Sequence, residues 1–161
     1  MLAASDEDDA FARLIEIAQA NEVMIGTAES MTGGQLAYLL TRQPGSGDVY
    51  AGGFVTYHTR VKQNILEVPE GPVVSHEAAR AMAAGARKLL DCDLVLSITG
   101  VAGPERQDDQ PVGCVFIGTA LRDLPAWSTQ HLFHGDPDAI RESASTTAAT
   151  IAHTLLTTRR L

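Results

Sequence analysis

A serine lies between an apolar run and two glycines in the stretch TAESMTGGQLAYLL, which spans residues 27–40. Residues 23–28 are predicted to form a buried strand, and apolar residues recur at helical spacing over 35–42. Ser30 therefore lies at a predicted strand-to-helix turn, where it could cap the helix or attack a carbonyl carbon. Gly33 and Gly34 would let backbone N–H groups approach a phosphate or a developing oxyanion. The turn matches neither the Walker phosphate loop nor G-x-G-x-x-G, so the local pattern leaves both interpretations open.

Two further polar clusters follow predicted strands. Tyr57 lies near the end of one strand, and Lys62 lies one helical turn further on. A buried lysine with a lowered pKa can take the proton of a serine, and a tyrosine can relay a proton or hold an oxyanion. The alternative is a solvated lysine and a tyrosine used for packing. The third cluster, residues 99–104, opens the longest segment without clear periodicity, and such long loops are often functional.

The predicted elements must bring these clusters together. Helices are predicted from Ser5 through Ala18 and over 35–42, 60–66, 75–90 and 138–156, and strands over 23–28, 53–58, 93–99, 113–120 and 127–133. This order predicts a single α/β domain over residues 1–161, a three-layer α/β/α sandwich with a mixed, mostly parallel central sheet. Ligands gather at the carboxyl ends of strands in such sheets. We therefore expect Ser30, Tyr57 and Lys62 to meet in one pocket, within reach of a hydrogen bond or one bridging water.

Composition excludes several classes of function. The chain has a formal net charge of −8, and it lacks the general basic character that nucleic-acid binding requires. No apolar run approaches the roughly 20 residues of a membrane span, and the acidic start MLAASDEDDA does not resemble a signal peptide, so a cytoplasmic location is expected. Cys92 and Cys114 are predicted to be buried free thiols. The five histidines show no ligand spacing, so no metal site is predicted.

Several motifs occur in order along the chain: TAESMTGG, GFVTYHTRVKQNIL, VSHEAARAMAAGARKLLDCDLVLSITG, SITGVAGP, PVG and FHGDPDAIRESA. Together they resemble the CinA C-terminal domain family, which includes the nicotinamide-nucleotide amidohydrolases called PncC, and the resemblance covers residues 8–157. It implies an α/β/α domain, commonly a homodimer. It also implies hydrolysis of the carboxamide of nicotinamide mononucleotide to nicotinic acid mononucleotide and ammonia, with no metal or organic cofactor.

The resemblance assigns roles to positions of this sequence. The family's nucleophilic serine falls on Ser30, its tyrosine on Tyr57 and its lysine on Lys62. Ser30 would attack the amide carbon, and Lys62, directly or through Tyr57, would take the serine proton. Backbone N–H groups of the 33–34 or 100–103 turn would hold the oxyanion. Contacts to the small-molecule nucleotide are expected from Glu29, Thr32, Gly33, Gly34, Thr99, Gly100, Ala102, Gly103, Arg106 and Arg141.

The chain also departs from the family pattern. A run of glycines usually follows A-G-P, whereas residues 105–110 here read ERQDDQ. Pro137 stands where the closing motif usually has an arginine, and Met31 replaces a residue that is often cysteine. The acidic loop should stand away from the pocket or fold over it, and a phosphorylated ligand should bind more weakly, although Arg106 could offset the acids. The alternative function is a catalytically weak or inactive paralogue that binds a nucleotide or a partner.

A homodimer is also expected from the helices. Residues 75–90 are rich in alanine, and the closing helix is rich in alanine and threonine. Small side chains permit close packing between helices of two copies.

Overall fold

The computed structural model describes residues 6–159. A five-stranded sheet in the order β2-β1-β3-β4-β5 forms its centre. The strands are β1 (Ile25–Glu29), β2 (Tyr50–Val55), β3 (Leu94–Gly100), β4 (Cys114–Leu121) and β5 (Trp127–Leu132). The helices are α1 (Asp6–Ala20), α2 (Gln35–Thr41), α3 (Ser46–Val49), α4 (Thr59–Leu66), α5 (His76–Leu90) and α6 (Pro137–Thr158). The predicted α/β fold with a mixed sheet flanked by helices is confirmed.

Parallel and antiparallel pairings divide the sheet evenly. β1 pairs in parallel with β2 and with β3, whereas the β3–β4 and β4–β5 pairs are antiparallel. The expected predominance of parallel pairing is therefore not found, because the connections from β3 to β4 and from β4 to β5 contain no crossover helix and reverse the chain. β1, β2 and β3 point the same way, so their carboxyl ends meet at one edge of the sheet.

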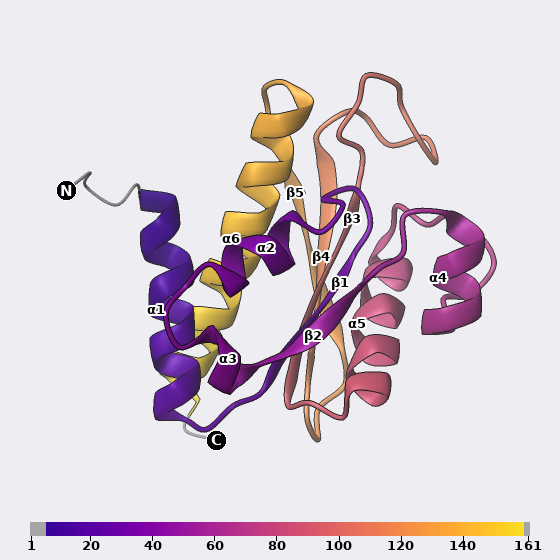
Figure 1. Ribbon diagram of the computed structural model, residues 1–161. Coiled ribbons are helices and arrows are strands. Elements are labelled where there is room, and N and C mark those ends of the chain that lie inside the picture. The colour runs from indigo at the N-terminus through magenta and orange to yellow at the C-terminus, as the bar shows by residue number, and fades with distance from the viewer. Residues whose placement is uncertain (1–5, 160–161) are drawn as a thin grey trace.

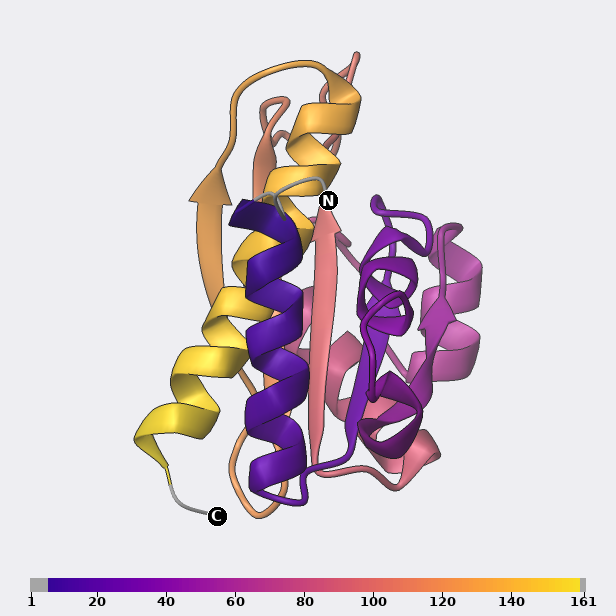
Figure 2. The ribbon, with the colours of Figure 1, turned by 60° about the vertical axis from the view of Figure 1, so that its left-hand side comes forward.

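Helices cover both faces of this sheet (Figures 1 and 2). Successive strand residues point to opposite faces. Leu94 and Leu96 of β3 pack in one apolar cluster with α1, α2 and α6, whereas Val95 packs in another with α5. β3 and β4 are buried along their whole length, which explains why their sequences are almost continuously apolar.

The small side chains of two helices are used inside the chain. Buried alanines of α5 pack against the sheet, and buried alanines of α6 pack in the cluster that contains α1. The sequence argument that these alanines serve contacts between two copies is therefore not supported.

The predicted elements differ from the structure mainly around β2. This strand ends at Val55 rather than continuing to residue 58, because the His58 side chain accepts a hydrogen bond from the Arg60 N–H and caps α4. The short helix α3 was not predicted, and Ser5, the predicted start of α1, lies outside the described residues. Cys92 and Cys114 are buried and unpaired, as expected. No helix in residues 6–159 is long and apolar enough to span a membrane.

Candidate active site

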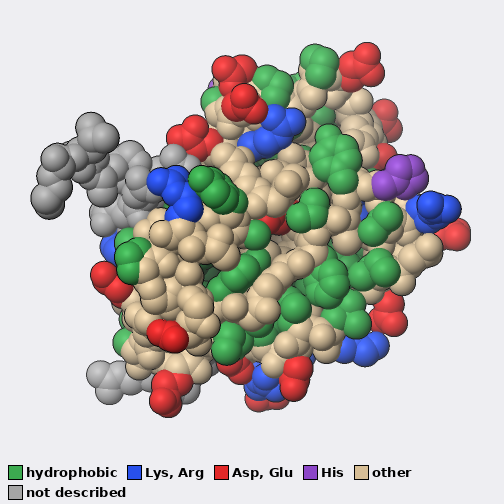
Figure 3. Space-filling view, viewed as in Figure 1, with side chains coloured by type: hydrophobic (Ala, Val, Ile, Leu, Met, Phe, Trp, Pro, Cys, Tyr) green, Lys and Arg blue, Asp and Glu red, His purple; other side chains and the backbone are tan. Residues whose placement is uncertain are grey.

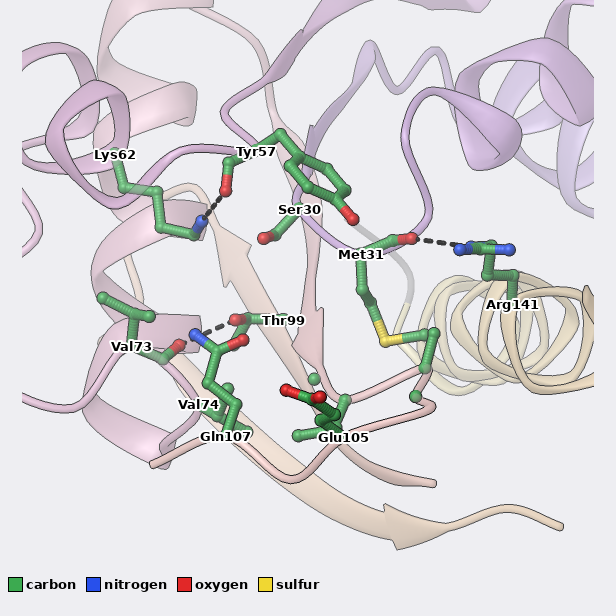
Figure 4. Close-up of a pocket in the computed structure, with 14 residues that line it drawn as sticks. Ser30, Met31, Tyr57, Lys62, Val73, Val74, Thr99, Glu105, Gln107 and Arg141 are labelled. Atoms are coloured by element: carbon green, nitrogen blue, oxygen red, sulfur yellow. Dashed lines mark hydrogen bonds between the residues drawn. The ribbon is translucent and has the colours of Figure 1, made fainter. Parts of the chain in front are cut away.

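A pocket of about 120 Å³ opens where the segments that follow β1, β2 and β3 meet (Figure 4). All three clusters recognised in the sequence contribute to it. Its lining comprises Ser30, Met31, Tyr57, Lys62, Val73, Val74, Thr99, Gly100, Val101, Ala102, Gly103, Glu105, Gln107 and Arg141. The structure thus brings Ser30, Tyr57 and Lys62 to one cavity, although no hydrogen bond joins these three side chains in the part of the chain described. Nor do residues 6–159 contain a group of three or more His, Cys, Asp or Glu side chains that could hold a metal ion.

Ser30 follows β1 directly and is fixed through its backbone. Its N–H donates to the Ile98 carbonyl of β3 at 3.0 Å, and its own carbonyl accepts from the Gly33 N–H at 3.1 Å. The residue is 8% exposed, and its hydroxyl has no hydrogen-bond partner among residues 6–159. A rigidly held serine therefore presents an unengaged hydroxyl to the pocket.

Lys62 lies in the first turns of α4 and is only 1% exposed. Its Nζ donates to the carbonyls of Thr56 at 2.7 Å and Tyr57 at 2.9 Å. Burial lowers the pKa of this amine from 10.5 to about 8, and the Asp108 carboxylate partly opposes this shift. A neutral amine has two N–H donors, so the two carbonyls can engage both and leave the lone pair free to accept a proton. Figure 4 shows Nζ and the Ser30 hydroxyl directed toward one another.

Tyr57 forms the lip of the pocket rather than part of its floor. The residue is 66% exposed, and its backbone carbonyl, not its hydroxyl, contacts Lys62. In Figure 4 the ring lies over Ser30 and the hydroxyl points toward the Met31 side of the pocket, away from Lys62. A proton relay from Ser30 to Lys62 through Tyr57 is therefore not supported. The position of the ring suits contact with a ligand held above Ser30.

The Glu29 carboxylate is turned away from the pocket and caps α2. It is fully buried and accepts from the Thr32 hydroxyl at 2.7 Å and from three backbone N–H groups, those of Gly34 at 3.0 Å, Leu36 at 3.1 Å and Ala37 at 2.9 Å. The Gly33 N–H is engaged by the Ser30 carbonyl. The structure thus does not bring Glu29, Thr32, Gly33 or Gly34 to the pocket, and the N–H groups of the two glycines are not available to an oxyanion.

This cap gives a stability prediction. Glu29→Gln places an amide N–H₂ among donors that need an acceptor, so we expect the free energy of unfolding to fall by about 2–3 kcal/mol. Urea denaturation measures this change. Glu77→Gln is the matched control, because Glu77 is exposed in the first turn of α5, and we expect a change of about 0.5 kcal/mol or less. Equal losses in the two variants would contradict a stabilising role for Glu29.

Other backbone N–H groups remain for an oxyanion. Those of Met31, Ala102 and Gly103 donate to no acceptor among the described residues, and all three residues line the pocket. Met31 is the residue immediately after Ser30, a position that supplies an oxyanion donor in other strand-to-helix serine turns. The N–H groups of the 102–103 turn and of Met31 are thus the available donors for an oxyanion, whereas those of the 33–34 turn are engaged.

Packing explains why Thr99 and Gly100 occupy the end of β3. The Thr99 hydroxyl donates to the Val73 carbonyl at 2.7 Å and so fixes one wall of the pocket. A Cβ at Gly100 would lie 2.8 Å from the Met31 sulfur and 2.7 Å from the Cys114 carbonyl oxygen. Only glycine permits the turn that carries Ser30 to pack this closely on β3.

Arg141 reaches the pocket from α6 and holds the Ser30 turn. Its Nε donates to the Met31 carbonyl at 3.0 Å, and its Nη1 pairs with Asp138 at 2.8 Å. Pro137 opens α6 behind the Asp136 cap, so the position where the family pattern has an arginine carries no cation here. Arg141 is the cation that α6 contributes to the pocket lining.

The loop over residues 105–110 folds against the pocket. Glu105 and Gln107 line it, which the sequence did not predict. Arg106 does not line it, because its guanidinium donates to the Asp109 carbonyl within the same loop at 2.7 Å. The Asp108 carboxylate accepts from two N–H groups of the 73–74 segment at 2.7 and 2.9 Å. The loop therefore lies against the pocket rather than away from it, with Glu105 and Gln107 at the rim.

Comparison with known proteins identifies similar chains. Residues 7–156 match the CinA C-terminal domain. A putative competence-damage inducible protein of Bacillus cytotoxicus is 37% identical over 142 residues, which are 85% of this chain and 34% of that protein. A protein of the same description from Lactiplantibacillus plantarum is 37% identical over the same shares of each chain. The chain thus spans about a third of the length of these curated relatives.

Solved structures agree with the fold. The CinA superfamily protein KP700603 of Klebsiella pneumoniae superposes with a TM-score of 0.91 at 28% identity, covering 96% of this chain and 100% of that one. The competence/damage inducible protein CihA of Agrobacterium tumefaciens gives 0.89 at 30% identity, covering 98% and 99%.

Proposed function

Because the chain belongs to the CinA C-terminal domain family, we propose that it is an amidohydrolase that cleaves the carboxamide of a nicotinamide nucleotide or nucleoside. The observation that carries this proposal is the unengaged Ser30 hydroxyl facing a buried lysine whose pKa is lowered to about 8. A serine and a neutral lysine form a nucleophile and a base that need no metal. The family resemblance suggests nicotinamide mononucleotide as one substrate, with nicotinic acid mononucleotide and ammonia as products.

The geometry supports a two-step reaction. Ser30 Oγ attacks the amide carbon while its proton passes to the neutral Lys62 Nζ, and N–H groups of Met31 and the 102–103 turn stabilise the oxyanion. When the tetrahedral intermediate collapses, the C–N bond breaks and Lys62 returns the proton to the departing nitrogen, which leaves as ammonia. Water then attacks the acyl–Ser30 ester with Lys62 again as base. The carboxylate product leaves and the Ser30 hydroxyl is restored.

The lowered pKa of Lys62 predicts the pH dependence. Only the neutral amine is a base, so kcat/KM for ammonia release should rise with pH, level off above about pH 8 and be about tenfold lower at pH 7. The Asp108 carboxylate raises the pKa of Lys62. Asp108→Asn should therefore shift the rise of kcat/KM to lower pH. The asparagine oxygen can still accept hydrogen bonds from the N–H groups of residues 73–74. A flat profile between pH 6 and 9 in the unsubstituted protein would contradict a lysine base.

A second candidate function rests on the loop over the pocket. Glu105 and Gln107 occupy positions where the family pattern has bare glycine backbone, and Pro137 removes a cation. These changes favour a module that binds a nucleotide or a partner without turnover. The two candidates differ in one result, because the module would bind a pyridinium carboxamide without releasing ammonia.

We further propose that the protein forms a homodimer. Apolar side chains are exposed on α2, around the end of the edge strand β2 and on α4, namely Tyr38, Val55, Tyr57, Val61 and Ile65, and hydrophobic side chains gather over this region in Figure 3. A second copy could cover them, since β2 is an edge strand. Light scattering at micromolar concentration should give twice the monomer mass. A monomer mass would reject the proposal.

A further inference from the structure

Two side chains of the loop over the pocket face it without a partner. Glu105 and Gln107 are exposed and line the pocket, so they form its rim. Neither side chain makes a hydrogen bond or an ion pair with the described residues. Figure 4 shows both across the pocket from Ser30, Tyr57 and Lys62. An unneutralised carboxylate therefore stands beside the space that a substrate must enter.

The loop is anchored, so this carboxylate has a defined place. Gln107 and Gln110 exchange backbone hydrogen bonds of 3.4 and 2.8 Å, and the two residues between them have φ values of 51° and 61°. This is the geometry of a tight two-residue hairpin turn, in which aspartate tolerates positive φ. The Asp108 carboxylate then fastens the turn to the N–H groups of Val73 and Val74, which themselves line the pocket.

The cations near the pocket are already engaged. Lys62 Nζ donates to two backbone carbonyls. Arg141 donates to the Met31 carbonyl and pairs with Asp138. Arg106 turns to the Asp109 carbonyl and does not line the pocket. Lys62 and Arg141, the two cations of the pocket lining, are thus held by backbone carbonyls and by Asp138, whereas the Glu105 carboxylate has no partner among residues 6–159.

The size of the pocket places any phosphate outside it. The pocket encloses about 120 Å³, which is well below the ~300 Å³ of sites that enclose a whole drug-sized ligand. It accommodates the ring that bears the carboxamide. The sugar and everything attached to it must leave past the rim, where Glu105 stands.

We propose that Glu105 is a specificity-determining residue through which the pocket selects pyridinium carboxamides that carry no phosphate. This inference rests on the proposed function and names its substrate class. The carboxylate attracts the cationic ring of either form of the substrate, but it repels a phosphate monoester, which carries nearly two negative charges. The phosphate-free substrate is therefore preferred. Glu105→Gln removes the charge, keeps the length of the side chain and leaves no protein group unpaired.

The test compares two ligands that differ only in the phosphate. Binding of nicotinamide mononucleotide and of nicotinamide riboside is measured by calorimetry in a Ser30→Ala background, which prevents turnover. At low ionic strength the riboside should bind about tenfold more tightly. Adding Glu105→Gln should abolish this preference. Adding Asp109→Asn should preserve it, because this matched change removes a charge from the same turn, at a residue that does not line the pocket.

Salt separates a charge effect from a packing effect. Screening should shrink the preference for the riboside toward equality at about 0.5 M salt, whereas a preference due to shape would persist. A specificity role for Glu105 is overturned if the mononucleotide binds as tightly as the riboside at low salt, or if neither ligand binds. It is also overturned if Glu105→Gln leaves the ratio of the two dissociation constants unchanged, or if Asp109→Asn changes that ratio by the same amount. Binding in the expected ratio without ammonia release by the unsubstituted protein would overturn the proposed function alone.

Discussion

Replacing Ser30 with alanine is expected to lower kcat for carboxamide hydrolysis by about a thousandfold or more. The hydroxyl is the atom that would form the acyl intermediate, and no other described residue offers a hydroxyl both unengaged and facing Lys62. Because the side chain makes no hydrogen bond to the rest of the described chain, its removal should leave ligand affinity and folding nearly unchanged. The experiment measures ammonia release, ligand binding and thermal unfolding on the same preparation.

Ser46→Ala is the control for this variant. Ser46 is a half-buried serine at the start of α3 whose hydroxyl donates to the Thr41 carbonyl, and it does not line the pocket. Its replacement should leave kcat within about twofold. If Ser30→Ala kept substantial activity while Ser46→Ala behaved as expected, Ser30 would not be the nucleophile.

Replacing Lys62 with methionine should lower kcat by about 10²- to 10⁴-fold, the contribution of a positioned general base. It should also remove the rise in activity near pH 8. Methionine has a similar length and leaves the Thr56 and Tyr57 carbonyls without their donor, but it also removes a buried cation. These effects on stability oppose one another, so the protein should remain folded. The pH profile of residual ammonia release and the thermal unfolding midpoint together measure the prediction.

Lys88→Met is the matched control, because Lys88 is an exposed lysine whose ammonium pairs with the exposed Glu67. That variant should keep both the activity and the pH profile. If the activity of the Lys62→Met protein still rose with pH near pH 8, another group would titrate there. The lysine would then serve only to position the 56–57 segment.

The order of strands and helices could be predicted because apolar periodicity reports burial directly. Residues 93–99 and 113–120 were recognised as strands from runs of apolar residues, and the structure buries them on both faces. The meeting of Ser30, Tyr57 and Lys62 followed from one topological rule, that the carboxyl ends of parallel strands share an edge. Most of the candidate site was thus within reach of the sequence.

The direction in which a polar side chain turns could not be predicted from the sequence. Glu29 precedes Ser30 in the chain, and only the structure shows that its carboxylate caps α2 instead of facing the pocket. The same holds for the loop. Its acidic composition was evident, but the loop is held by the Asp108 carboxylate, which accepts from residues distant in sequence, and Arg106 turns to the Asp109 carbonyl instead of the pocket. Tertiary hydrogen bonds of this kind leave no local signal.

Ammonia release by the purified, unsubstituted protein at about pH 8.5 shows whether Ser30 and Lys62 form a working amidohydrolase site. Nicotinamide mononucleotide and nicotinamide riboside are supplied in parallel, and ammonia is measured together with the carboxylate product. The account predicts continuous release of both products in equal amounts from at least one of the two amides. If the protein is folded and binds both amides yet releases no ammonia from either, the chain is a binding module and the assignment of Ser30 and Lys62 to catalysis is wrong.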